Sequence, residues 1–138
     1  MDPITAVGTA GELAGVLWQL VKQIRQLVEA AKGARQALID LARRMERMRL
    51  LLNEFKSLAQ RLENSDHRGI LLSFDDIGCR ETLGQLQTLV NKLSLEAGVH
   101  QMWMKVNWIW HKEDAAKLLS RLAAHESDLS SALQFIAA

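Results

Sequence analysis

One apolar seam runs through residues 34–62, and it constrains the fold more than any other feature of the chain. Nine apolar residues follow one another at steps of four and three, namely Ala34, Leu38, Leu41, Met45, Met48, Leu52, Phe55, Ala59 and Leu62. This period places them on one side of an α-helix, whereas a strand would alternate every second residue. A long helix that is apolar on one side only needs other helices to cover that side. The seam therefore predicts a helical bundle.

Other segments carry the same period, and the sequence offers no competing strand pattern. Main helices are expected over about residues 3–31, 34–63, 75–97 and 113–137, with a short connecting helix over about 99–111. Asp2 before Pro3 is a helix start, and the carboxylates of Asp75 and Asp76 suit the start of the third main helix. With 138 residues the chain is long enough for one core. The prediction is an all-α, antiparallel four-helix bundle with a short extra connecting helix, forming a single domain over 1–138.

Composition argues against catalytic, metal-binding and nucleic-acid-binding functions. The net charge is +1, and no aromatic residue stands among the clustered cations, which disfavours nucleic acid as a partner. The four histidines, His67, His100, His111 and His125, lack the spacing of a metal site, and His125 is expected at the edge of the core. Phosphate loops and nucleophile elbows are absent, so we expect no enzyme and no cofactor. The lone Cys79 excludes an internal disulfide and favours a reducing compartment.

The first 21 residues are unusual for a helix because they hold three glycines and only two charges, Asp2 and Glu12. Three glycines cost a helix roughly 2–3 kcal/mol relative to alanine. Such a cost suggests close backbone approach, either to neighbours within the bundle or to copies of the same chain. Both explanations remain open from the sequence. The candidate residues for membrane insertion or self-association are Gly8, Gly11, Glu12, Leu13, Gly15 and Leu17.

This segment is also nearly long enough to enter a bilayer. Pro3 to Val21 comprises 19 residues, close to the roughly 20 that span the hydrocarbon core. A central Glu12 costs about 2.5–3.5 kcal/mol, and each apolar residue returns only about 0.3–0.6 kcal/mol. Because the balance is near zero, we expect a conditional element that inserts only when several copies share Glu12 around a wet lumen.

A basic stretch follows the glycine-rich segment. Between residues 22 and 49, eight cations oppose three acidic residues. The candidates for a lipid-facing patch are Lys22, Arg25, Lys32, Arg35, Arg43, Arg44 and Arg47. Each cation well placed against an anionic leaflet contributes about 1 kcal/mol. The alternative is a solvated helix face with pairs such as Asp40 and Arg44.

A tryptophan-rich segment lies before the last main helix. Trp103, Trp108 and Trp110 are close together in the sequence. Indole rings of this kind either form an exposed partner surface or pack into one end of a bundle. Packing is the commoner outcome, and the sequence does not decide between the two.

Several stretches together resemble the N-terminal domains of fungal NLR-like receptors, the HeLo, HeLo-like and Ses-type domains. The resemblance spans nearly the whole chain and rests on composition and spacing. It is carried by Met1-Asp2-Pro3, Lys32-Gly33-Ala34-Arg35, Trp108 with Lys112-Glu113-Asp114, Leu118-Leu119-Ser120-Arg121-Leu122 and Leu129-Ser130-Ser131-Ala132-Leu133. The chain departs from the family in one respect. Only Gly11 and Gly15 form a small-xxx-small pair, so the longer glycine zipper of some HeLo proteins is incomplete.

The resemblance implies an effector of programmed cell death and heterokaryon incompatibility in fungal innate immunity. Such a domain would be cytoplasmic at rest and would act at the plasma membrane after oligomerisation, with its N-terminal helix damaging the bilayer and Glu12 lining a pore. The implied partners are further copies of the chain, anionic membrane lipids and neighbouring receptor modules. The alternative is a signalling adaptor that makes only protein–protein contacts through its second helix or its tryptophan segment.

Overall fold

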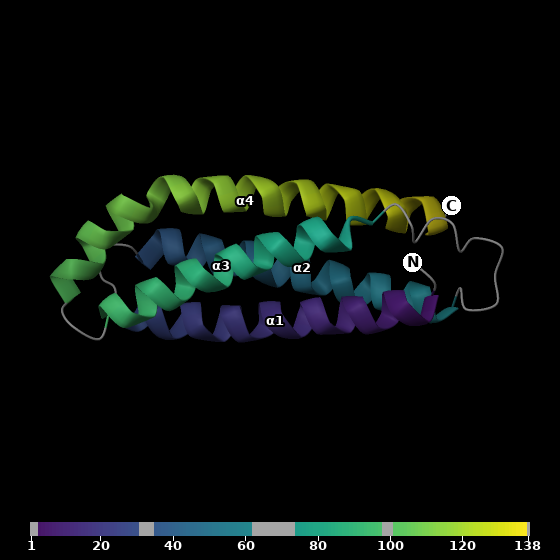
Figure 1. Ribbon diagram of the computed structural model, residues 1–138, viewed down its shortest axis with the longest axis horizontal. Coiled ribbons are helices and arrows are strands. Elements are labelled where there is room, and N and C mark those ends of the chain that lie inside the picture. Colours follow the sequence, from purple (N-terminus) through teal and green to yellow (C-terminus); the bar gives the residue numbers. More distant parts are fainter. Residues whose placement is uncertain (1–2, 31–34, 62–73, 98–100, 138) are drawn as a thin grey trace.

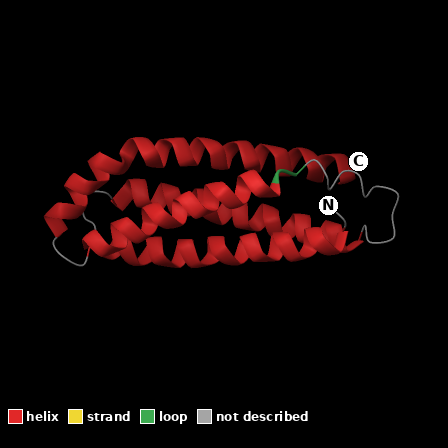
Figure 2. Cartoon of the chain, in the orientation of Figure 1, coloured by secondary structure: helices red, strands yellow, loops and turns green. Residues whose placement is uncertain are grey.

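A computed structural model of the protein describes the backbone of residues 3–30, 35–61, 74–97 and 101–137. The side chains that it describes are those of residues 5–28, 36–61, 74–94 and 112–134. Within these ranges only the two residues before the third helix are not helical, and there is no strand (Figure 2). The predicted all-α fold is confirmed.

In the part of the chain that the structure describes, four long helices form the bundle (Figure 1). They are α1 (Pro3–Ala30), α2 (Arg35–Arg61), α3 (Asp76–Ala97) and α4 (Gln101–Ala137). Consecutive helices run in opposite directions, as predicted. Around the bundle, α1 lies beside α2 and α3, and α4 lies beside the same two helices. As a result α1 and α3 are parallel neighbours, and so are α2 and α4.

The core is built mainly from the apolar sides of α1 and α2. All seven described members of the predicted 34–62 seam are fully buried, and the other two, Ala34 and Leu62, lie outside the described side chains. On α1 the buried side chains are small near the start of the helix, at Ala6 and Ala10, and larger toward its end, at Ile24. Where α3 begins, Phe74 packs on Phe55 with ring centroids 5.3 Å apart. The period of the sequence therefore identified the core correctly.

The last helix corrects one expectation. A short connecting helix over about 99–111, separate from a helix over 113–137, is wrong, because Gln101 to Ala137 forms one helix of 37 residues. The physical reason is visible in the sequence, since no glycine or proline interrupts this stretch. The tryptophan-rich segment is thus the first part of α4. This first part lies at one end of the bundle (Figure 1).

The start of α3 is capped by Asp75. Its Oδ1 accepts a hydrogen bond from the backbone N–H of Gly78 at 2.8 Å, which satisfies one of the free amides of the first turn. A Cβ on Gly78 would lie 2.1 Å from the Asp75 Oδ2, so glycine leaves room for the capping carboxylate. The predicted helix start at Asp75 and Asp76 is confirmed.

We expect Asp75→Ala to lower the free energy of unfolding by about 1 kcal/mol, because the Gly78 amide loses its acceptor. Urea denaturation followed by circular dichroism measures this change. Asp75→Asn is the control, since an asparagine oxygen caps a helix equally well. Equal losses in both variants would contradict a capping role.

Candidate functional site

The three glycines of α1 do not serve close packing inside the bundle. Gly8 and Gly15 are exposed, and a Cβ at either position would have no atom of another described helix within 4 Å. A Cβ on Gly11 would touch the flexible end of Lys56 at 3.5 Å, an ordinary contact. Of the two explanations left open by the sequence, packing within this bundle therefore has no support at Gly8 and Gly15. Both lie on an open face of α1.

Two other residues of α1 that were predicted to take part in membrane insertion or self-association are buried. Leu13 and Leu17 are 1% and 0% exposed and belong to the core. In this conformation they face neither lipid nor another copy. Insertion of α1 into a membrane would have to take these leucines out of the bundle.

Glu12 is exposed and points to α3. Its Oε1 accepts a hydrogen bond from Nη1 of Arg80 at 2.6 Å. This bond holds the pKa of the Arg80 guanidinium above its ordinary value. Glu12 therefore belongs to a contact between α1 and α3.

An exposed tryptophan on α1 is surrounded by cations. Trp18 is 38% exposed. Its ring centroid lies 5.0 Å from Cζ of Arg49, 5.5 Å from Nζ of Lys22 and 6.0 Å from Cζ of Arg25. All three separations lie within the range of cation–π attraction, which amounts to roughly 0.5–1 kcal/mol at exposed sites. The arrangement presents an indole and three positive charges to solvent together.

Arg49 is fixed over this ring by a partner on its own helix. Its guanidinium forms a two-bond contact with the Glu46 carboxylate, in which Nε donates to Oε2 at 2.9 Å. The hydrogen bonds from Arg49 hold the pKa of Glu46 below its ordinary value of 4.5. Glu46 thus orders the arginine and stays ionised.

A groove between α1 and α2 continues this surface. It is lined by Arg25, Val28, Ile39, Ala42, Arg43, Glu46, Arg47 and Leu50. Leu50 is an exposed apolar residue, 52% accessible, next to the cations of α2. Arg25 links the groove to Trp18. We call the set Trp18, Lys22, Arg25, Arg43, Arg47, Arg49 and Leu50 the Trp18 surface.

At the other side of α2, two arginines face α4. Nη1 of Arg44 and Nε of Arg47 lie 3.8 and 3.7 Å from Oε2 of Glu126. Both arginines remain substantially exposed, whereas Glu126 is buried. Five residues of the predicted basic patch thus lie near Trp18, line the groove or face Glu126. They are Lys22, Arg25, Arg43, Arg44 and Arg47. Lys32 and the side chain of Arg35 lie outside the described residues.

The sequence-based prediction missed Trp18 and Leu50, and it counted Arg49 among the cations of residues 22–49 without placing it beside an aromatic ring. Trp18 stands four residues before Lys22 and seven before Arg25, a spacing that places all three on one helix face. That pattern was available from the sequence. Arg49 and Leu50 belong to another helix and join the surface only through the packing of α1 on α2.

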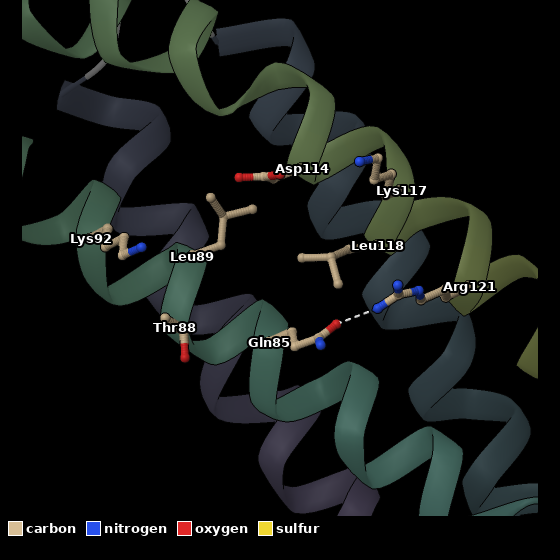
Figure 3. A pocket seen from close by; sticks show the side chains of 8 residues that line it. All are labelled: Gln85, Thr88, Leu89, Lys92, Asp114, Lys117, Leu118 and Arg121. Atoms are coloured by element: carbon tan, nitrogen blue, oxygen red, sulfur yellow. Dashed lines mark hydrogen bonds between the residues drawn. The ribbon is translucent and has the colours of Figure 1, made fainter.

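A second groove lies between α3 and α4 (Figure 3). Leu89 and Leu118 face each other in it, and polar side chains surround them. Nη1 of Arg121 donates a hydrogen bond to Oε1 of Gln85 at 2.5 Å. Lys92 and Lys117 are exposed at this groove. Its described lining side chains include cations and no aromatic residue, so it provides a comparison for the Trp18 surface.

The structure shows no metal cluster or reactive cysteine among its described residues. No group of three or more His, Cys, Asp or Glu side chains in this part of the chain is arranged to hold a metal ion. Cys79 is buried, and burial together with the Asp75 charge raises the pKa of its thiol to about 12. His125 is buried and lies 3.0 Å from the Thr82 hydroxyl, as expected for a core histidine. The side chains of Trp103, Trp108 and Trp110 lie outside the described set.

Within the described residues, no helix combines the length and apolar character needed to cross a bilayer. Comparison of the chain with protein-family models, curated proteins and solved structures gives no match. The resemblance to the N-terminal domains of fungal receptors therefore stays a prediction.

We expect Gly8→Ala and Gly15→Ala each to raise the free energy of unfolding by about 0.5–1 kcal/mol, because alanine is the better helix former and meets no obstacle. Gly84→Ala is the matched control, since Gly84 is also exposed within a helix and open around its Cβ. Chemical denaturation of the three variants measures the effect. A loss at Gly8 or Gly15 together with a gain at Gly84 would show that the open face of α1 is covered in solution.

The contact between Glu46 and Arg49 predicts a pH dependence. Because the folded pKa of Glu46 lies below its ordinary value of 4.5, the contact stabilises the fold fully above that value and is lost as the pH falls through the folded pKa. Denaturation of the wild type and Glu46→Gln across the acidic range measures it. The stability difference should shrink as the pH falls below about 4.5, and a difference independent of pH would contradict it.

Proposed function

We propose that this chain is a helical effector domain that binds anionic membrane surfaces through the Trp18 surface and self-associates there. The observation that carries the proposal is the exposed Trp18 ring beside Lys22, Arg25 and Arg49. Tryptophan favours the headgroup region of a bilayer because its ring is apolar and its N–H is polar. Clustered cations are attracted to anionic lipids at about 1 kcal/mol each.

The rest of the Trp18 surface favours the same partner. It carries five cations, with Arg44 nearby, and the carboxylates that contact these arginines are Glu46 and Glu126. The exposed Leu50 adds an apolar contact between the cations. This mixture of positive charge, indole and leucine fits the boundary between lipid headgroups and acyl chains better than it fits water.

Self-association is assigned to the open face of α1. Gly8 and Gly15 leave backbone exposed without side chains, and small residues let helices approach closely once they are at or within a membrane. Entry of α1 itself would be a later and conditional step. It requires release of Leu13 and Leu17 from the core and of Glu12 from Arg80.

In the wider proposal the domain rests in the cytoplasm and moves to the plasma membrane when neighbouring receptor modules bring copies together, leading to cell death. The resemblance to fungal NLR-like receptor domains supports this part. The proposal assigns the chain no catalytic step and no cofactor. A protein–protein adaptor would use the same surfaces without lipid, and vesicle binding separates the two functions.

We expect Arg25→Gln combined with Arg43→Gln to weaken binding to vesicles of phosphatidylcholine and phosphatidylserine roughly 5- to 30-fold, since two cations contribute about 1 kcal/mol each. Co-sedimentation measures the affinity, and dye leakage reports membrane damage in the same samples. Trp18→Ala should weaken binding as well.

Lys92→Gln combined with Lys117→Gln is the matched control, because it removes the same charge from the groove between α3 and α4. This control should bind nearly as well as the wild type. Equal losses of affinity in both double variants would show that vesicle binding depends on the net charge of the protein and not on the Trp18 surface. No binding by the wild type, with oligomers also inactive, would overturn the proposed function.

A further inference from the structure

One carboxylate is buried between α2 and α4 with little compensation. Glu126 is 6% exposed, and its Oε1 has no hydrogen-bond partner among the described residues. Its Oε2 lies 3.7–3.8 Å from the nearest nitrogens of Arg47 and Arg44, beyond hydrogen-bonding distance. A buried carboxylate held by charge attraction alone depends strongly on those two arginines.

Glu126 depends on the two arginines, but the arginines do not depend on Glu126. The side chains of Arg44 and Arg47 are 45% and 68% exposed, whereas that of Glu126 is 8% exposed. If Glu126 were neutral, the arginines would remain hydrated at little cost. If the arginines were occupied elsewhere, Glu126 would be left as a buried charge without a partner, which favours its exposure to water.

One of these two arginines also belongs to the surface proposed to meet the membrane. Arg47 lines the groove of the Trp18 surface, and Arg44 lies three residues before it on α2. Phosphate and carboxylate groups of lipids form short, paired hydrogen bonds with guanidinium groups. Such bonds are stronger than the long contacts that the arginines make with Glu126.

On the opposite side, α4 is held by a different kind of contact. Thr82 donates its hydroxyl hydrogen to the carbonyl oxygen of Gly78 at 3.0 Å, so its oxygen is free to accept from Nε2 of His125 at 3.0 Å. This buried bond between α3 and α4 contains no group that lipid would compete for. A change at Glu126 would therefore affect the contact with α2 and leave the contact with α3.

From these contacts we propose that Glu126, Arg44 and Arg47 form a releasable contact: an anionic lipid surface draws the two arginines away, and the uncompensated Glu126 drives α4 away from α2. The inference rests on the proposed membrane binding. It adds a trigger to that function, because binding through one face of α2 would loosen the contact on its other side.

A distance measurement across α2 and α4 tests the release. Ser57 and Gln134 are exposed and line the same groove between the two helices, so Ser57→Cys and Gln134→Cys can carry spin labels. The buried Cys79 has too high a thiol pKa to compete for the label. We expect the label distance to lengthen on vesicles containing phosphatidylserine and to stay short in buffer and on pure phosphatidylcholine.

Glu126→Gln is the decisive variant because it keeps the shape and removes the charge. It should bind the anionic vesicles at least as tightly as the wild type, because its arginines leave no carboxylate behind. It should show no lengthening, because no buried charge remains when the arginines leave. If the wild type binds the anionic vesicles and its label distance does not change, the proposed release is wrong and the proposed membrane binding still stands. Lengthening in the Glu126→Gln variant equal to that of the wild type leads to the same conclusion. Failure of the wild type to bind overturns the proposed function and the lipid trigger together.

A second test needs no lipid. Arg44→Gln with Arg47→Gln should lower the melting temperature by about 5–10 °C, since Glu126 loses both counter-charges and is costly to bury in the folded bundle. Adding Glu126→Gln to this pair should restore most of the loss. If the double variant fails to fold, recovery of a folded triple variant supports the inference. A triple variant no more stable than the double overturns it.

Discussion

Short and branched aliphatic side chains on one side of α1 fill the space against α2, and the surfaces of the protein follow from this pairing. Ala6 and Ala10 are fully buried near the start of α1, and Ile24 is fully buried near its end. Since these residues occupy one side of α1, the other side is left with Gly8, Gly15 and exposed Trp18. The packing of the core thus determines which groups are available for function.

The remaining helices are joined to this pair by contacts that differ in strength. Between α3 and α4 lie a buried hydrogen bond and facing leucines, whereas the pairs α1–α3 and α2–α4 also carry ion pairs, at Glu12 with Arg80 and at Glu126 with two arginines. The two hairpins, α1 with α2 and α3 with α4, also share one apolar core. The ion pair of Glu12 with Arg80 lies at the surface, where such pairs are weak and screened by salt, whereas Glu126 is buried. The ion pairs are thus the charged part of a contact between hairpins that the apolar core also makes.

Much of the fold and part of the site could be predicted from the sequence. The 34–62 seam, the start of α3 and the place of His125 were predictable because period, capping and burial are local consequences of residue type. The continuity of α4 was also readable, since nothing in the sequence breaks it. Trp18 was overlooked although its spacing to Lys22 and Arg25 places it on their face, whereas its contact with Arg49 depends on two helices and could not be read from either.

The sequence by itself determined that the chain is helical, where its core lies and that its cations are concentrated between residues 22 and 49. Only the tertiary structure decided that α2 has α4 rather than α3 as its second neighbour. The physical reason is that periodicity defines which side of a helix is buried but not which helix covers it. That choice brings Arg44 and Arg47 to Glu126 and turns part of a basic stretch into a contact within the bundle.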